Sequence, residues 1–185
     1  IITISKHSKE VYQNTSYSGR NEQGEEQQIK VTTPIEYVSY PCRVSEPAKL
    51  DLDLTTEFNF LTVAQLSPRK NVDQLIRTFV DKFKDNDNVG LIIKANTAKN
   101  SLIDRNHTLA NFRKVFNNLK PYKCKLYLLH GYLTESEMAG LYTHSKIKAF
   151  VTATHGEGFG LPLFESAYYG LPVIATDWSG HLDFL

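Results

Sequence analysis

The most informative stretch of this sequence is residues 150–176, F-V-T-A-T-H-G-E-G-F-G-L-P-L-F-E-S-A-Y-Y-G-L-P-V-I-A-T. Its pattern predicts a short buried strand at 150–152, an irregular loop, a helix, and a second strand at 173–175. Three glycines within five residues exclude regular structure from the loop. Pro162 suits the first turn of a helix, because its missing N–H would have no partner there. Gly170 and the proline two residues later end that helix.

The predicted loop combines groups that bind anions with groups that bind hydroxyls. Backbone N–H groups and the helix dipole favour an anion there, and Gly156, Gly158 and Gly160 let a ligand approach the backbone. Glu157 in the loop and Glu165, eight positions on, offer carboxylates that accept hydrogen bonds from hydroxyls. Taken singly, each residue is more simply explained as a turn glycine or a helix-start acid. Together they predict a site for a sugar nucleotide.

The order E-G-F-G-L-P-x-x-E from Glu157 to Glu165, followed by G-L-P-V-I-A-T, resembles a known signature. This is the E-x7-E signature of retaining glycosyltransferases of the GT-B fold, family 4 (glycosyl transferases group 1) in particular. The resemblance implies that Glu157 contacts the donor sugar as the catalytic carboxylate and that Glu165 contacts the ribose hydroxyls. It also implies donor contacts from the intervening residues Gly158, Phe159, Gly160 and Leu161.

A second candidate segment is A-Q-L-S-P-R-K-N at residues 64–71, directly after a predicted strand. Arg69 and Lys70 precede a predicted helix, for which Asn71 is expected to be the N-cap. Two cations at a helix N-terminus favour a bound anion, although a solvated basic turn would cost only roughly a few tenths of a kcal/mol. Related enzymes carry G-R-L-x-x-x-K-G here, so the resemblance implies that Lys70 contacts the donor diphosphate. Gln65 replaces the family's arginine, and Arg69 is a candidate to compensate.

Further candidates follow other predicted strands. His130 and Gly131 end one strand, and the resemblance implies that this glycine lies near the nucleotide base. Tyr132 is a candidate to stack on that base, although a buried tyrosine is the simpler explanation. His155 could bond a phosphate or a sugar hydroxyl, but a lone loop histidine is more often solvated. Gly180 resembles a family glycine that faces the donor.

From Phe58 onward, predicted strands and helices alternate five times, which predicts an α/β fold with a doubly wound parallel sheet. The resemblance makes this the Rossmann-like C-terminal domain of a GT-B enzyme, with a remnant of the N-terminal domain. Ligands of such sheets bind beyond the carboxyl ends of the strands, where the candidate loops lie. The other predicted strands are 58–64, 89–95 and 125–129, and the other predicted helices are 72–83, 109–119 and 134–142.

The expected domain organisation has three parts. Residues 1–45 are the remnant of the N-terminal, acceptor-side domain, and they contain a mobile polar loop at 13–30. Residues 46–57 form a linker. Residues 58–185 form the nucleotide-sugar donor-binding domain, truncated at its C-terminus. Within the remnant, the pattern predicts strands at 1–4 and 34–40 and a helix at 6–12.

Bulk properties exclude several classes of function. The chain has 185 residues, and its formal net charge of +1 gives no strong field for nucleic acid. It has no apolar run long enough for a membrane span. Cys42 and Cys124 lack metal-ligand spacing, so we expect no metal site and two reduced thiols in a cytoplasmic protein.

The resemblance implies a transferase that moves a sugar from a UDP- or GDP-linked donor to a glycan, a lipid or another hydroxyl acceptor, with retention of anomeric configuration. No cofactor or metal is expected, because the helix dipole and basic residues neutralise the leaving diphosphate. The fragment alone is expected to be inactive, since the acceptor domain is missing. One alternative is a non-catalytic nucleotide-sugar binding or scaffolding module. Another is a different GT-B enzyme, such as a sugar-nucleotide epimerase.

Overall fold

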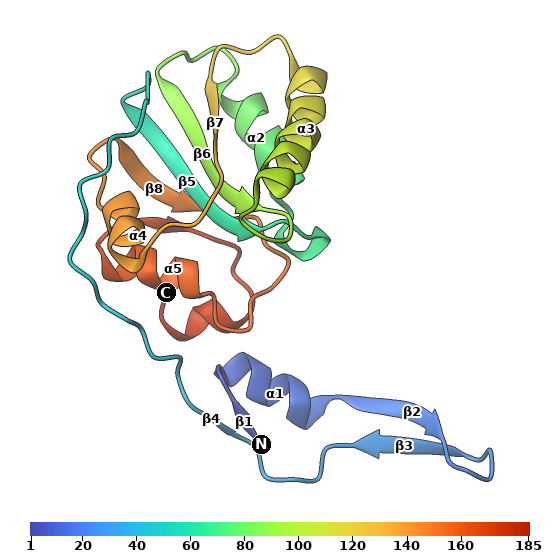
Figure 1. Ribbon diagram of the computed structural model, residues 1–185. Helices are drawn as coiled ribbons and strands as arrows, with labels where there is room; N and C mark the ends of the chain where they lie inside the picture. Colours follow the sequence, from blue (N-terminus) through green and yellow to red (C-terminus); the bar gives the residue numbers. More distant parts are fainter. The chain divides into compact units, whose positions relative to one another are not determined.

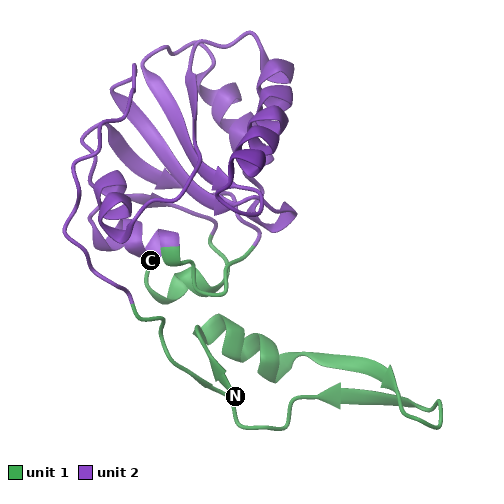
Figure 2. Ribbon diagram, viewed as in Figure 1, with its two compact units in different colours: residues 1–41, 156–161, 177–185 green, residues 42–155, 162–176 purple.

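The structure is a computed structural model that describes residues 1–185, and it divides into two compact units (Figure 2). The larger unit contains residues 42–155 and 162–176. The smaller unit contains residues 1–41, 156–161 and 177–185. The two units are described separately below.

A five-stranded parallel sheet forms the centre of the larger unit, with strand order β7-β6-β5-β8-β9. The order reverses direction at β5, since β6 and β7 lie on one side of it and β8 and β9 on the other. This is the topological switch point at which open α/β sheets bind ligands. The strands are β5 (Phe58–Gln65), β6 (Val89–Asn96), β7 (Lys125–Leu129), β8 (Ile147–Val151) and β9 (Val173–Ile174).

Helices cover both faces of this sheet, which confirms the predicted fold class. Figure 1 shows α2 and α3 together on one side of the strands and α4 on the other. None of the helices has the length and apolar character needed to cross a bilayer. The helices are α2 (Val72–Phe83), α3 (Leu102–Leu119), α4 (Glu135–Tyr142) and α5 (Leu161–Tyr168).

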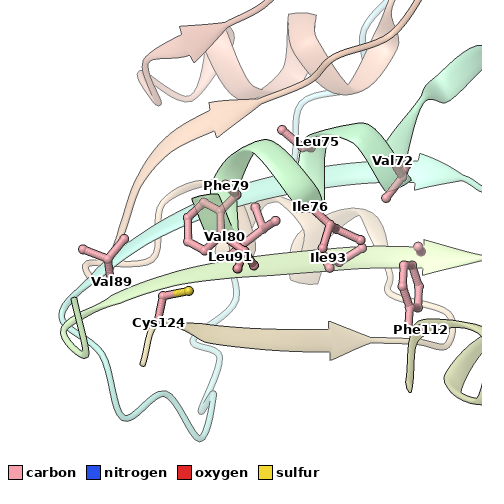
Figure 3. Close-up of a cluster of buried hydrophobic side chains, with 11 residues drawn as sticks. Val72, Leu75, Ile76, Phe79, Val80, Val89, Leu91, Ile93, Phe112 and Cys124 are labelled. Atoms are coloured by element: carbon pink, nitrogen blue, oxygen red, sulfur yellow. The ribbon is translucent and has the colours of Figure 1, made fainter. Parts of the chain in front are cut away.

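A cluster of buried apolar side chains lies between α2 and β6 (Figure 3). Apolar side chains recur along α2 at spacings of three and four residues, so they share one face of the helix. Consecutive residues of β6 are buried, as expected for a strand that is covered on both faces. The buried members of these two elements include Val72, Leu75, Ile76, Phe79, Val80, Leu91 and Ile93.

The start of α3 differs from the sequence prediction. The helix begins at Leu102 rather than at residue 109, and Ser101 caps it by accepting a hydrogen bond from the Asp104 N–H at 3.1 Å. Leu102 and Ile103 are exposed, so the first turns lack the apolar stripe on which the prediction depended. The Ser-x-x-Asp capping pattern was the signal that could have placed this boundary.

The capping predictions for the other helices have opposite outcomes. The capping box of α4 is confirmed, because Thr134 and Glu137 bond each other's backbone N–H reciprocally. Asn71 lies at the N-cap position of α2, as predicted, but its side chain makes no capping hydrogen bond. It donates instead to the carbonyl of Ala153 at 3.1 Å, and its backbone has the left-handed φ of 52°.

The smaller unit begins with a strand, a helix and a hairpin. Its elements are β1 (Ile2–Thr3), α1 (Lys6–Asn14), β2 (Ser16–Arg20), β3 (Glu26–Lys30) and β4 (Glu36–Tyr37). β1 and β4 form a parallel pair of only two residues each, so the strand predicted at 34–40 is much shorter than expected. Ser5 caps α1 by accepting from the Ser8 N–H. The Lys6 N–H donates to Asp183 at 2.8 Å, which ties this helix to the end of the chain.

Residues 13–30, for which the composition predicted a mobile loop, end α1 and form the antiparallel hairpin of β2 and β3. Turn chemistry explains the difference. The Asn21 side-chain oxygen accepts from the N–H groups of Gln23 and Glu25, and Gly24 supplies a left-handed φ of 82°. A polar sequence thus forms strands because its turn is well specified, although little of it is buried.

Candidate functional site

The basic candidates Arg69 and Lys70 lie in a 3-10 helix, Pro68–Lys70, immediately before α2. Arg69 is exposed and Lys70 is partly buried. The structure therefore places both cations at the entrance to a helix at the carboxyl end of β5, as the sequence predicted. Gln65, the residue in place of the family's arginine, is exposed at the end of β5, and its side chain donates to the Thr97 carbonyl at 3.4 Å.

Backbone hydrogen bonds join this basic turn to the segment after β8. The Arg69 carbonyl accepts from the His155 N–H at 2.9 Å and from the Thr154 hydroxyl at 3.3 Å. The bond from Asn71 to Ala153 adds a third link between the same two segments. The His155 side chain is exposed, and its backbone, rather than its ring, makes this connection. The carboxyl ends of the neighbouring strands β5 and β8 are thus held in fixed register.

His130, a candidate for donor contact, uses its ring for an internal pair. Its Nε2 lies 2.9 Å from Oδ2 of Asp104, and the two side chains are only 3% and 8% exposed. Asp104 also accepts from the N–H groups of Thr97 and Ala98, at 3.2 and 3.0 Å. The hydrogen bond from His130 is the main cause that lowers the Asp104 pKa. Sequence reasoning missed Asp104, which joins the loop after β6 to the end of β7.

The residues after His130 form an exposed turn. Gly131 has a φ of 116°, which L-residues with side chains rarely adopt. Its carbonyl accepts a hydrogen bond from the Lys94 ammonium, and burial lowers the pKa of that lysine. Tyr132 is 75% exposed, so it is not the buried tyrosine that was the simpler expectation. An exposed aromatic ring beside a glycine turn is available to stack on a base.

Glu165 lies on α5, which the chain enters directly from the glycine-rich loop. Pro162 is in the first turn of this helix, as predicted, and Gly170 follows it with a left-handed φ of 78°. Oε2 of Glu165 accepts a hydrogen bond from the Tyr142 hydroxyl at 2.8 Å. Burial raises the Glu165 pKa, and the Tyr142 hydrogen bond opposes that shift. Sequence reasoning proposed this carboxylate as a site residue but did not identify its partner Tyr142.

In the smaller unit, Glu157 is anchored through its backbone and is only 8% exposed. Its N–H donates to the Ser179 hydroxyl at 2.8 Å, and its carbonyl accepts from the Gly180 N–H at 3.0 Å. A Cβ at Gly180 would lie 2.0 Å from the carbonyl oxygen of Gly158, so only glycine fits this contact. The candidate Gly180 therefore has a packing role against the glycine loop. The buried ring of His181 lies 3.4 Å from the Ser179 hydroxyl.

One of the remaining loop residues of the signature, Phe159, packs against two other aromatic rings. Phe159 is buried, with the ring centroids of Tyr40 and Phe184 at 6.0 and 5.0 Å. The Phe159 side chain therefore packs inside the protein, and its backbone is the part that suits contact with a ligand. Gly160 has a φ of 92°, and the next residue, Leu161, begins α5. No group of three or more His, Cys, Asp or Glu side chains in the chain is placed to hold a metal ion.

Comparison with known proteins places this architecture in context. A family model described as glycosyl transferases group 1 matches residues 48–185. The serotype-specific mannosyltransferase WbdA of Escherichia coli is 31% identical over 121 residues, which cover 64% of this chain and 13% of WbdA. The GtfA subunit of the UDP-N-acetylglucosamine–peptide N-acetylglucosaminyltransferase of Streptococcus pneumoniae is 26% identical over 121 residues, or 65% of this chain and 21% of that protein. This chain thus spans a small part of either relative's length.

Solved structures support the fold assignment. The crystal structure of the pneumococcal O-GlcNAc transferase GtfA, in complex with UDP and GlcNAc, has a TM-score of 0.59 and 20% sequence identity. The match covers 100% of this chain and 31% of that one. The five-stranded parallel sheet matches the Rossmann-like C-terminal domains of GT-B glycosyltransferases. Since the family model covers more than half of the residues, this chain belongs to the glycosyl transferases group 1 family.

Proposed function

We propose that this chain is the donor-binding part of a retaining glycosyltransferase of family 4. The intact protein would transfer a sugar from a nucleoside diphosphate sugar to a hydroxyl of a glycan, a lipid or another acceptor. Family membership supports sugar transfer, and the E-x7-E pattern supports retention. The nucleotide donor is supported by the UDP present in the GtfA structure, which shares the fold of this chain.

The observation that carries this proposal is the state of the two signature carboxylates. Glu157 is buried in a loop whose backbone is hydrogen-bonded on both sides, so its position is well defined. Glu165 is partly buried on the helix that follows and accepts a hydrogen bond from a tyrosine. Two carboxylates held in defined positions within one signature, rather than solvated at the surface, suit hydrogen bonds from the hydroxyls of a ligand. Glu157 would contact the sugar, and Glu165 the ribose hydroxyls.

The basic turn completes the proposed donor chemistry. Lys70, with Arg69 beside it, would contact the diphosphate at the start of α2, where helix N–H groups also favour an anion. These groups would stabilise the negative charge of the leaving diphosphate, so the proposal needs neither a metal ion nor a cofactor. The donor would be UDP- or GDP-linked. Backbone groups of Gly158, Phe159 and Gly160 would approach it, with Leu161 at the start of the helix.

The proposal also assigns the parts of the chain. Residues 1–45 would be the end of the acceptor-side domain, 46–57 the linker and 58–185 the donor domain. Groups that bind the acceptor would then lie outside this chain, which spans 13% of the mannosyltransferase it matches. The free thiols of Cys42 and Cys124 suit a cytoplasmic enzyme of glycan synthesis.

The first experiment is a thermal-shift screen of the protein with UDP, GDP, ADP and their sugar conjugates. A ligand that binds only the folded state raises Tm, so one diphosphate is expected to shift Tm and thereby identify the base. Glu165→Gln is expected to weaken binding of that diphosphate about 5- to 10-fold, because an amide accepts hydroxyl hydrogen bonds less strongly than a carboxylate. Unchanged affinity in this variant would contradict the ribose assignment.

A second candidate function is a nucleotide-sugar binding or scaffolding module without catalysis. Gln65 favours it, because this neutral side chain replaces the arginine of the family pattern and bonds a backbone carbonyl. Release of nucleoside diphosphate by the intact protein with an acceptor would support transfer, whereas binding without release would support the module. Interconversion of donor sugars without any acceptor would instead support an epimerase.

A further inference from the structure

We infer that Tyr142 is a positioning residue for Glu165, holding its carboxylate in place for the ribose hydroxyls of the nucleotide donor. The inference rests on the function proposed above for Glu165. Tyr142 is the last residue of α4, and its hydroxyl donates to Oε2 of Glu165 at 2.8 Å. A carboxylate has about four lone-pair sites, so one phenol hydrogen bond leaves acceptor capacity for both ribose hydroxyls.

The phenol is fixed in the orientation that this hydrogen bond requires. Tyr142 is buried, and its ring stacks on that of Tyr169 with centroids 6.1 Å apart and an interplanar angle of 17°. Tyr169 is itself held, because its hydroxyl donates to the Ser45 carbonyl at 2.9 Å and accepts from the Ser45 N–H at 3.0 Å. Two locked rings therefore present one hydroxyl to Glu165, which is the kind of support that keeps a binding group in a productive geometry.

The helix that carries Tyr142 is also anchored at both ends. The capping box of Thr134 and Glu137 fixes its start. Near its end, Gly140 packs so closely on the backbone of Ala48 that a Cβ there would lie 2.0 Å from the Ala48 carbonyl oxygen. Tyr142 thus extends from a rigid element, and its position relative to α5 depends on backbone packing rather than on a loop.

The Tyr142 hydroxyl also affects the protonation of Glu165. Burial raises the pKa of Glu165, the negative charge of Glu135 raises it further, and the Tyr142 hydrogen bond lowers it. Burial raises the pKa of the nearby Cys42 thiol, and the negative charge of Glu165 raises it further. Burial raises the pKa of Tyr142 far above its ordinary value, so this phenol stays protonated and acts as a donor. Of these neighbours, Tyr142 is the one that favours the ionised carboxylate.

The test is the affinity of Tyr142→Phe for UDP, GDP and ADP, measured by calorimetry on the intact protein between about pH 5 and 8. Phenylalanine keeps the ring and its stacking and removes only the hydroxyl. We expect about 3- to 10-fold weaker binding of the diphosphate that the parent protein binds. We also expect the loss of affinity on acidification to begin at higher pH, because the Glu165 carboxylate is then protonated more readily.

The matched control is Tyr127→Phe, which removes a tyrosine hydroxyl that bonds Thr55 and Thr56 rather than Glu165. It is expected to leave the pH profile of binding unchanged, and the melting temperature of each unliganded variant reports any loss of fold. Tyr142→Phe is also combined with Glu165→Gln. If Tyr142 acts through Glu165, it is expected to have little further effect in the double variant.

The outcomes separate this inference from the function on which it rests. If the parent protein binds none of the three diphosphates, the donor-site proposal fails and the inference falls with it. If the parent binds one and Glu165→Gln weakens that binding, but Tyr142→Phe changes neither affinity nor pH profile, only the positioning role is overturned. Full additivity in the double variant overturns it as well.

Discussion

Ser179 combines a strained backbone with a side-chain hydrogen bond that fixes the glycine-rich loop. Its φ of 88° lies in the left-handed region, where residues other than glycine are uncommon. Its hydroxyl accepts the N–H of Glu157 at 2.8 Å and lies near the buried ring of His181. A glycine would adopt this backbone without strain but would leave the Glu157 N–H without that acceptor. The hydrogen bond to the serine hydroxyl therefore fixes the glycine loop, at the cost of strain in the serine backbone.

Two substitutions at this position separate these effects. Ser179→Ala retains the strained φ and loses the acceptor, so we expect it to lower the free energy of unfolding by about 1–3 kcal/mol. Ser179→Gly loses the same acceptor but relieves roughly 1 kcal/mol of strain, and it should be the more stable of the two. Urea unfolding of both variants measures the difference. An alanine variant as stable as the parent would contradict the role of the hydroxyl.

At the scale of elements, α4 is positioned by a close approach between a helix and an extended segment. The Ala48 N–H donates to the Ser136 carbonyl at 2.9 Å, and the Ser136 hydroxyl donates to the Glu46 carbonyl at 2.6 Å. Gly140 lets the same extended segment lie against the helix face, as the distance from a built Cβ to the Ala48 oxygen shows. This contact fixes the distance between α4 and the extended segment near the end of the helix that carries Tyr142.

Gly140→Ala is therefore expected to destabilise the protein. Within an exposed helix this change stabilises by about 1 kcal/mol, because glycine is a poor helix former. Here the added methyl group meets a backbone carbonyl rather than a flexible side chain, so either the helix or the segment must move. Thermal unfolding should show a lower Tm, together with weaker nucleotide binding if the Tyr142 hydroxyl shifts. A rise in Tm would mean that the segment moves at little cost.

The same scale shows which features a sequence can predict. The bounds of α2 and β7 matched their prediction because apolar spacing alone determines them. Glu157 and Glu165 could be proposed as site residues because a local pattern of the sequence specifies them. Three residues were missed because their hydrogen-bond partners are distant in the sequence and come close only when the chain packs. These residues are Tyr142, Ser179 and Asp104. The hairpin at 16–30 was missed because a side-chain turn, rather than burial, specifies it.

At the scale of the whole molecule, two carboxylates have opposite effects on how the free energy of unfolding changes with pH. The pKa of Asp104 is lowered, mainly by its hydrogen bond with His130. The ionised Asp104 therefore adds to the free energy of unfolding above its unfolded pKa of about 3.9, and this stabilisation is lost as pH falls through the lower folded pKa. The pKa of Glu165 is raised, mainly by burial. The protonated Glu165 therefore adds to the free energy of unfolding below its unfolded pKa of about 4.3, and this stabilisation is lost as pH rises through the higher folded pKa.

Single variants should separate these two contributions in the unliganded protein. Asp104→Asn is expected to lower Tm near neutral pH and to flatten the fall in Tm below about pH 4, because the titrating group has gone. Glu165→Gln should act on the other side, removing the loss of stability that accompanies ionisation above about pH 4. Asp51, which is exposed, supplies the control Asp51→Asn. Melting curves between about pH 2.5 and 8 that run parallel to the parent's for both variants would show that neither carboxylate has the folded-state pKa assigned to it.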